Sequence, residues 1–343
     1  MIKPKPLHKG STLAIVSPSW GGPYLFPHIY QKGLQNLKAL GFNIIEYPSA
    51  TMAATTLFQN PKLRSDDINS AFKNPDIDGI IATIGGSDSA RILKDLDIEA
   101  IKKNPKFFMG FSDTTSITTT LNQAGLVTFN GPSVMAGFAQ FHNFDNNYQS
   151  YIRNFLTGCS NTLELPTFSH YSHGYPDWAN IENTGKRAII LQSRGPQVLQ
   201  GNHTVTGRLF GGCMEVLEML KGTDYWPSPD FWQNKVLFLE TSEEKPSIDS
   251  IRYWLRNYGV MGVFDKLSAL LIGRPRDYNE KEQIQLEKTI VSVVKEEFSN
   301  EQLAIIANLD FGHTDPQVIL PLGIKCKVDI SSGRLTLCES AFI

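Results

Sequence analysis

Three polar residues, Ser112, Glu240 and His313, have the side-chain types needed for nucleophilic catalysis. Each follows an apolar segment: KFFMGF, KVLFL and LAIIANLDFG, respectively. Serine is a poor nucleophile at neutral pH and needs a neighbouring base, a role that suits histidine, while a carboxylate orients and stabilises the imidazolium. The chain order Ser, Glu, His also occurs in one α/β hydrolytic fold, although geometry and not order defines a triad.

The segment KFFMGFSDTT also has a simpler interpretation. Ser112 or Asp113 could cap the helix that follows the turn at Gly110, which is a common role for both residue types. A full GxSxG motif is absent because Thr114 stands where the second glycine would be. On the local pattern alone, helix capping is favoured over a nucleophile.

The carboxylate and the histidine have equally ordinary alternatives. An isolated glutamate after an apolar strand is usually a solvated strand end, and a lone histidine there is usually a hydrogen-bonded turn residue. The segment ETSEE also offers Glu243 and Glu244 as alternatives to Glu240. The residue types alone therefore leave the choice of carboxylate open.

Two backbone amides are candidates for stabilising an acyl oxyanion. A helix that begins near Asp113 would point its N–H groups toward the reacting carbonyl. The Gly85-Gly86 turn could supply the second donor, because glycine permits a positive φ and a close approach of the backbone. A plain tight turn or a phosphate loop is the alternative, although the spacing GxGxxG or GxxxxGK[ST] is missing.

The elements that must position these residues alternate between strands and helices in the first 140 residues. Apolar, β-branched segments predict strands, and helical spacing with a glycine C-cap predicts helices; the strands are expected at 11–19, 43–48, 79–84 and 106–111, and the helices at 28–40 and 65–73. This alternation favours a Rossmann-like or flavodoxin-like parallel layer. Catalytic groups collect at the carboxyl ends of such strands.

The character of the chain changes between about 141 and 200, where Asn, Tyr, Ser, His and Pro are frequent and periodicity is weak. We expect a linker and surface loops there. Regular signals return at 207–220, 235–241, 247–258, 266–275, 280–298 and 303–314, which predicts a second α/β domain. The expected organisation is a nucleophile-bearing domain (1–150), linker and substrate loops (151–200) and a C-terminal domain (201–343).

Composition excludes several classes of protein. The chain has 343 residues and a formal net charge of −2, with Lys and Arg dispersed, so nucleic acid binding has little support. No sustained apolar segment predicts a signal peptide or a membrane span, and a cytoplasmic soluble protein is expected. Cysteines at 159, 213, 326 and 338 form no CxxC pair, and His170 and His173 lack an HExxH helix, so neither a metal nor a disulfide is predicted.

Several spaced segments together resemble one known family, the serine peptidases that comprise LD-carboxypeptidases and microcin C self-immunity (MccF-like) proteins. The resemblance is carried by 11–19, 65–93, 104–138, 207–227, 236–260, 271–275 and 311–329, in the order typical of the family. It implies a two-domain enzyme with its site at the domain junction, without metal or cofactor. Family members commonly form homodimers.

The resemblance also implies a role for individual residues. The serine of GFSD is Ser112, the first glutamate of ETSEE is Glu240, and the histidine of FGHT is His313. The amides of Asp113 and Gly86 would form the oxyanion hole.

Two motifs indicate the MccF-like branch. LD-carboxypeptidases typically resemble RGGYG and EDVGE where this chain has TIGGSDS and ETSEE. The branch implies hydrolysis of the amide that joins an aminoacyl group to a nucleotide-like moiety, as in processed microcin C, with Gly85 and Ser87 near the substrate and Trp178 stacking on the base. Cys213 replaces the asparagine of the family's GGN.

Two other functions remain as alternatives at this point. One is an LD-carboxypeptidase that trims the terminal D-alanine of a murein tetrapeptide. The other is a non-catalytic binding protein with two lobes that close on a small ligand, in which Ser112 merely caps a helix. The position of Ser112 relative to His313 discriminates between an enzyme and a binder.

Overall fold

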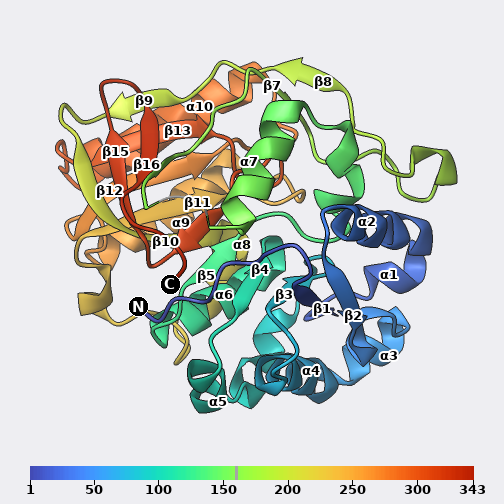
Figure 1. Cartoon of the computed structure of the whole chain (residues 1–343). Helices are drawn as coiled ribbons and strands as arrows, with labels where there is room; N and C mark the ends of the chain where they lie inside the picture. Colours follow the sequence, from blue (N-terminus) through green and yellow to red (C-terminus); the bar gives the residue numbers. More distant parts are fainter. Residues whose placement is uncertain (159–160) are drawn as a thin grey trace.

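The computed structural model of the chain describes residues 1–158 and 161–343 (Figure 1). Its first sheet has six strands in the order β14-β5-β4-β3-β1-β2, with β1 to β5 parallel and β14 antiparallel to β5. The parallel order 2-1-3-4-5 is that of flavodoxin-like folds. The strands are β1 (Thr12–Val16), β2 (Asn43–Glu46), β3 (Gly79–Ala82), β4 (Phe107–Gly110), β5 (Thr128–Asn130) and β14 (Leu320–Leu322).

Both faces of this sheet are buried, and successive residues of β1 show why. Leu13 and Ile15 belong to the hydrophobic cluster that includes helix α2 (Pro27–Ala39), whereas Ala14 and Val16 belong to the cluster that includes α4 (Pro61–Lys73). Side chains alternate between faces along a strand, so a strand covered on both sides is apolar throughout. This explains the continuous apolar segments of the sequence.

Shorter helices complete the cover of the first sheet. They are α1 (Gly22–Leu25), α3 (Ala54–Gln59), α5 (Ile98–Lys103) and α6 (Thr115–Gln123), with 3₁₀ turns η1 (Pro48–Ala50), η2 (Ser89–Asp95), η3 (Ser112–Thr114) and η4 (Phe138–Asn143). Among them, η3 and α6 directly follow β4 and carry the predicted nucleophile. None of the described helices is long and apolar enough to cross a membrane.

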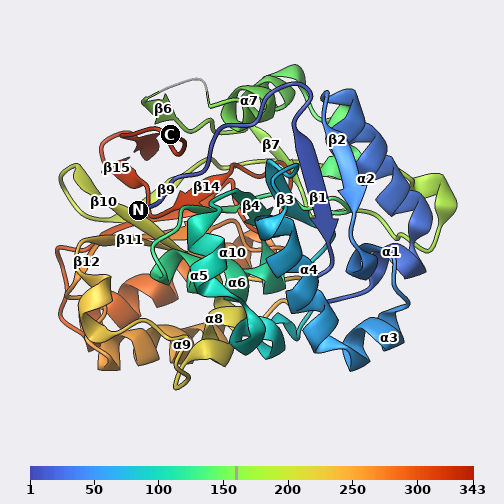
Figure 2. The same ribbon diagram turned by 60° about the horizontal axis from the view of Figure 1, so that its bottom comes forward.

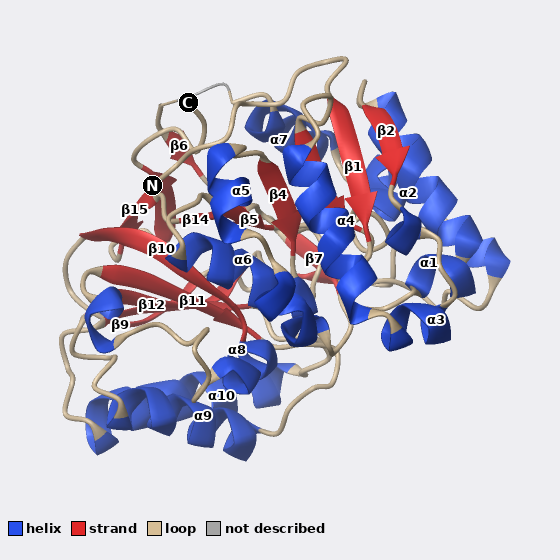
Figure 3. Ribbon diagram, turned by 90° about the horizontal axis from the view of Figure 1, so that it is seen from below, coloured by secondary structure: helices blue, strands red, loops and turns tan. Residues whose placement is uncertain are grey.

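The second sheet has eight strands in the order β6-β16-β15-β10-β11-β12-β13-β9. Its centre, β10 to β13, is parallel, while β9 and β15 pair antiparallel to it. Figure 3 shows α8, α9 and α10 along one side of this sheet. The elements are β10 (Val205–Cys213), α8 (Met214–Leu220), β11 (Lys235–Glu240), α9 (Ile248–Val260), β12 (Leu267–Gly273), α10 (Glu280–Val291), β13 (Ala304–Leu309), β15 (Lys325–Asp329) and β16 (Arg334–Leu337).

The segment 141–200 is more regular than the sequence predicted. Helix α7 (Asn146–Leu156) begins at Asp145, whose carboxylate accepts a hydrogen bond from Tyr148 N, and it buries Tyr148, Ile152 and Phe155. The expectation of a linker is therefore wrong for this helix, because its frequent Asn, Gln and Tyr residues mask an amphipathic spacing. Short strands follow: β6 (Leu163–Glu164), β7 (His170–Ser172), β8 (Ile190–Gln192) and β9 (Gln197–Gln200).

The two sheets are joined by chain segments that cross between them. Strand β14, from near the C-terminus, extends the first sheet through pairs such as Leu320 with Asn130. Both termini lie side by side in Figures 1 and 2, and Ile343 N donates to Pro4 O at 3.1 Å. The carboxyl ends of β4, β11 and β13 consequently face a common region.

A close backbone contact fixes the second sheet against helix α6. Cys213 N, at the end of β10, donates a hydrogen bond of 3.1 Å to Thr115 Oγ1. A Cβ at Gly212, which has a φ of +153°, would lie 2.5 Å from the Thr115 side chain, so only glycine fits. Cys213 makes no side-chain cap for α8, and its role here is through the backbone.

Candidate active site

Ser112 occupies a sharp turn between β4 and helix α6. Its φ of 57° lies in the left-handed region, which costs a residue with a side chain about 1–2 kcal/mol. The turn is held because Phe111, Asp113 and Thr114 are buried around it. Strained residues of this kind concentrate at functional sites, and a strand-to-helix turn is the typical position of a serine nucleophile.

Neither Ser112 nor Asp113 caps the helix. The turn η3 and helix α6 both begin without a side-chain cap hydrogen bond. The Asp113 carboxylate instead accepts a hydrogen bond of 2.8 Å from Ser89 N. The capping interpretation of GFSDTT is therefore wrong, and the left-handed turn at Ser112 needs another explanation.

The Gly85-Gly86 turn lies directly against the predicted nucleophile. A Cβ at Gly85 would be 2.7 Å from Ser112 Oγ and 3.3 Å from Asp113 N. Gly86 has a φ of +147°, and its Cβ would be 2.2 Å from Ser19 Oγ. Both positions require glycine, as expected for a loop that must bring its backbone close to a reacting group.

His313 and Glu240 form a buried pair at the ends of two strands of the second sheet. His313 Nδ1 lies 2.6 Å from Glu240 Oε2, and both side chains are buried. Because an ionised carboxylate only accepts hydrogen bonds, Nδ1 is the donor. The ring of Phe111, next to Ser112, packs edge-on against the His313 ring with centroids 4.9 Å apart.

The other ring nitrogen of His313 faces a second carboxylate. Nε2 lies 3.0 Å from Glu243 Oε2. Burial alone would lower the pKa of His313, but the adjacent Glu240 and Glu243 carboxylates outweigh it and raise that pKa to about 10. The contact with His313 in turn lowers the pKa of Glu243 to about 2, whereas burial raises the pKa of Glu240.

Ser112 and His313 line the same cavity, which has a volume of about 340 Å³. The cavity is therefore shared by residues from both sheets, as the positions of the strand ends predicted. Gly85, Gly86 and Ser87 also line it. Its remaining walls come from Ser19, Trp20, Ala54, Phe58, Ile84, Asp88, Phe111, Tyr175, Glu243 and Glu244.

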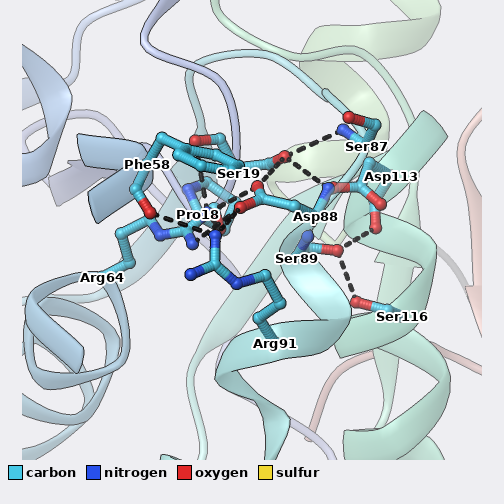
Figure 4. A network of polar contacts seen from close by, with 10 residues as sticks. All are labelled: Pro18, Ser19, Phe58, Arg64, Ser87, Asp88, Ser89, Arg91, Asp113 and Ser116. Carbon is cyan, nitrogen blue, oxygen red and sulfur yellow. Dashed lines mark hydrogen bonds and ion pairs between the residues drawn. The ribbon is translucent and has the colours of Figure 1, made fainter. Parts of the chain in front are cut away.

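A buried ion pair holds the loop that carries Gly85 and Gly86 (Figure 4). Both terminal nitrogens of Arg64 contact the Asp88 carboxylate, at 2.7 and 3.0 Å, and Arg64 is fully buried. Ser19 Oγ donates to Asp88 Oδ1 and accepts hydrogen bonds from the backbone N–H groups of Ser87 and Asp88. Arg91 also contacts Asp88, at 2.8 Å.

The same loop is attached to the nucleophile turn at its other end. Ser89 N donates to Asp113 Oδ2, and Ser89 Oγ donates to Asp113 O at 2.7 Å (Figure 4). Ser89 Oγ also lies 2.6 Å from Ser116 Oγ in α6. The Gly85–Ser89 loop and the Ser112 turn are therefore parts of one hydrogen-bonded unit, which the sequence did not indicate.

The aromatic residues on the cavity wall do not include Trp178, the residue that the sequence predicted to stack on a base. Trp178 is 6% exposed and stacks on Tyr175 with ring centroids 3.9 Å apart, so that Tyr175 and not Trp178 lines the cavity. The backbone carbonyl of Trp178 also lies 2.9 Å from His28 Nε2. Trp20 also lies on the cavity wall.

The described residues contain no group of three or more His, Cys, Asp or Glu side chains that could hold a metal ion. Cys213, Cys326 and Cys338 are free thiols, and Cys159 lies outside the described residues. His173 Nδ1 accepts a hydrogen bond of 3.0 Å from Asp277 N.

Comparison with known proteins identifies relatives over the whole chain. Residues 13–131 match the family model of the LD-carboxypeptidase N-terminal domain, and residues 206–328 match that of the C-terminal domain. The microcin C7 self-immunity protein MccF of Escherichia coli is 27% identical over 97% of this chain and 95% of its own. A "Probable murein peptide carboxypeptidase" of Bacillus subtilis is 24% identical over 96% of this chain and 91% of its own.

Solved structures give the same result. An MccF-like protein from Streptococcus pneumoniae, crystallised with AMP, is 28% identical and superposes with a TM-score of 0.84 over 96% of this chain and 98% of its own. MccF structures with glutamyl sulfamoyl guanosine and aspartyl sulfamoyl adenosine match in fold, each with a TM-score of 0.85 over the full length of both chains, at 24% and 23% identity. The chain belongs to the LD-carboxypeptidase family of serine peptidases, with MccF among its homologues.

Proposed function

We propose that this enzyme hydrolyses the amide bond between an aminoacyl group and a nucleotide-like group, using Ser112, His313 and Glu240. The observation that carries the proposal is the shared cavity, in which Ser112 at a strained turn and His313 with its Nδ1 bonded to Glu240 both line the wall. The ligands of MccF and of the Streptococcus pneumoniae protein support a nucleotide-like leaving group. Inactivation of processed microcin C or similar compounds would give resistance.

In the proposed reaction, Ser112 Oγ attacks the amide carbonyl carbon while His313 Nε2 takes the hydroxyl proton. The N–H groups of Gly86 and Asp113 stabilise the oxyanion, and Glu240 stabilises the imidazolium. His313 then gives the proton to the leaving nitrogen as the C–N bond breaks. A water molecule, deprotonated by His313, hydrolyses the acyl-enzyme ester and restores Ser112.

The test is hydrolysis of aminoacyl sulfamoyl adenosines by the purified enzyme, with product release followed by chromatography. Ser112→Ala should abolish turnover because it removes the attacking oxygen, while Ser331→Ala, at the exposed turn between β15 and β16, should leave it unchanged. Equal rates for wild type and Ser112→Ala would refute the assignment of the nucleophile.

A murein tetrapeptide is the rival substrate, favoured by the name of the Bacillus subtilis relative. Release of its terminal D-alanine, with no turnover of any aminoacyl sulfamoyl adenosine, would decide for an LD-carboxypeptidase. The non-catalytic binding protein loses support, because the chain belongs to a peptidase family.

The proposal includes a cytoplasmic homodimer, which rests on the resemblance to the family alone. Light scattering on the purified enzyme should give twice the chain mass of 38.3 kDa. A mass of one chain at micromolar concentration would exclude the dimer without affecting the proposed reaction.

A further inference from the structure

The loop that follows β11 presents two glutamates to the cavity. Glu243 and Glu244 both line it, together with Asp88, and no lysine or arginine does so in the part of the chain that the structure describes. Asp88 is already neutralised by its contacts with Arg64 and Arg91. Glu243 and Glu244 are therefore the carboxylates that a bound molecule meets.

Glu244 has no charged partner to satisfy it. Its backbone N donates to Ser242 Oγ at 3.1 Å, but within the described residues its carboxylate makes no hydrogen bond or ion pair. The loop below it is fixed, because Glu215 accepts hydrogen bonds from both the N–H and the hydroxyl of Ser242. The backbone of Glu244 is thus held at the cavity, and its carboxylate is available to a ligand.

The carboxylate of Glu243 contacts Nε2 of His313, the nitrogen that acts as the base in the proposed reaction. The Glu243 side chain is 47% exposed, and its carboxylate lies 3.0 Å from Nε2 of the buried His313 ring. While this contact persists, Nε2 cannot accept a proton from Ser112. Turnover therefore requires a competing partner for the Glu243 carboxylate.

We infer that Glu243 and Glu244 select substrates whose acyl side chain carries positive charge, and that this side-chain charge draws Glu243 away from His313. The inference rests on the proposed function and specifies its substrate class: amides of basic aminoacyl groups. An ammonium group replaces the imidazolium as the partner of Glu243 through charge-assisted hydrogen bonds. Glu244 supplies the second carboxylate of the same recognition site.

An acidic acyl side chain would meet the opposite situation. Two carboxylates on one wall repel it, and this repulsion would act as a specificity device against such substrates. MccF was crystallised with glutamyl and aspartyl sulfamoyl nucleosides, both of which carry an acidic acyl side chain. The inference therefore separates the specificity of this chain from the ligands of its homologue.

The experiment compares kcat/KM for lysyl, norleucyl and glutamyl sulfamoyl adenosine, where norleucine matches lysine without its side-chain ε-amine. We expect lysyl to exceed norleucyl and norleucyl to exceed glutamyl, with a lysyl-to-glutamyl ratio of at least about tenfold. The double variant Glu243→Gln/Glu244→Gln should bring that ratio close to one. Glu301→Gln, which removes an exposed carboxylate in the loop before β13, should leave the ratio unchanged.

The ratio isolates charge selection from any general loss of activity, since loss of the Glu243 charge beside His313 alters the rate with every substrate. Binding of the same three compounds to Ser112→Ala, measured by calorimetry, gives the ratio without turnover and without changing the glutamates. A preference for glutamyl, or an unchanged ratio in the double variant, would overturn the inference. Absence of hydrolysis with all three compounds would instead overturn the proposed function, while the binding ratio would still decide the inference.

Discussion

The Glu243 carboxylate lies 3.0 Å from Nε2 of His313, the nitrogen that would receive the proton of Ser112 in the proposed reaction. Glu240 contacts the opposite nitrogen at 2.6 Å, so the imidazole is enclosed by two carboxylates. Such a pair stabilises the protonated ring, which cannot act as a base. In the described arrangement, the imidazole that the proposed reaction uses as its base is therefore held between two carboxylates.

The pH dependence of activity should report this arrangement. Glu240 and Glu243 raise the pKa of His313 to about 10 against the effect of burial, so the imidazole stays protonated well above its ordinary pKa of 6.5. The neutral base becomes populated only as the pH approaches 10. In wild type, kcat/KM should therefore increase through the alkaline range. Glu243→Gln removes one of the two carboxylates and should move the rise to lower pH.

The measurement is kcat/KM of both proteins from pH 6 to about 10.5, because this parameter reports the groups of the free enzyme. Glu301→Gln serves as the control for loss of a distant negative charge. Identical apparent pKa values for wild type and Glu243→Gln would show that Glu243 does not hold the imidazolium.

The backbone strain at Ser112 predicts a difference in stability between two variants at this position. Ser112→Ala keeps a side chain at a φ of 57°, whereas Ser112→Gly removes it. The free energy of unfolding of the glycine variant should be about 1 kcal/mol higher than that of the alanine variant. This difference is the relief of strain at the positive φ minus the loss caused by the greater freedom of glycine in the unfolded chain. Urea titrations of the two variants measure this difference, and a less stable glycine variant would argue against strain.

Gly85→Ala should impair catalysis more than folding. The added Cβ would lie 2.7 Å from Ser112 Oγ, so either the loop or the serine must shift. Displacement of a nucleophile and its oxyanion donors costs more than ~100-fold in kcat. Steady-state kinetics, with circular dichroism as a check on folding, would test this; wild-type kcat would contradict the close approach.

Loss of Arg64 should destabilise the enzyme, because the negative charge of Asp88 would then be balanced by Arg91 alone. Removing one partner of a buried ion pair costs about 3 kcal/mol, and Arg64 is fully buried. The matched control is Lys62→Ala on the same helix, whose exposed contact with Asp66 should matter little. Urea denaturation of Arg64→Ala and Lys62→Ala compares the two, and equal stabilities would refute a structural role for the Arg64–Asp88 pair.

The sequence predicted that the site residues lie at strand ends, but the local pattern favoured a helix cap at Ser112, and the choice of Glu240 over Glu243 and Glu244 rested on the family resemblance. Ser112, Glu240 and His313 each follow an apolar strand, and parallel strands deliver their carboxyl ends to one side of a sheet. The turn glycines were predicted for the same reason, since a Gly-Gly pair after a strand permits a close backbone approach. Roles in catalysis for these residues stay proposals.

Long-range contacts were beyond the reach of sequence patterns. Arg64 meets Asp88 across 24 residues and Ser19 meets it across 69, so nothing near any of them indicated the network. Tyr175 and Trp178 are three residues apart, yet tertiary packing placed Tyr175 on the cavity wall and Trp178 behind it. Helix α7 was also missed, because the polar composition of its segment was given more weight than the spacing of its apolar residues.

Strand β14 returns from the second half of the chain to the edge of the first sheet. The two sheets therefore cannot move apart without breaking the backbone hydrogen bonds between β14 and β5. The hydrogen bond between Cys213 and Thr115 would break as well. Admission of a substrate without such separation requires only the rearrangement of side chains that line the cavity, and Glu243, which is half exposed, is one of them.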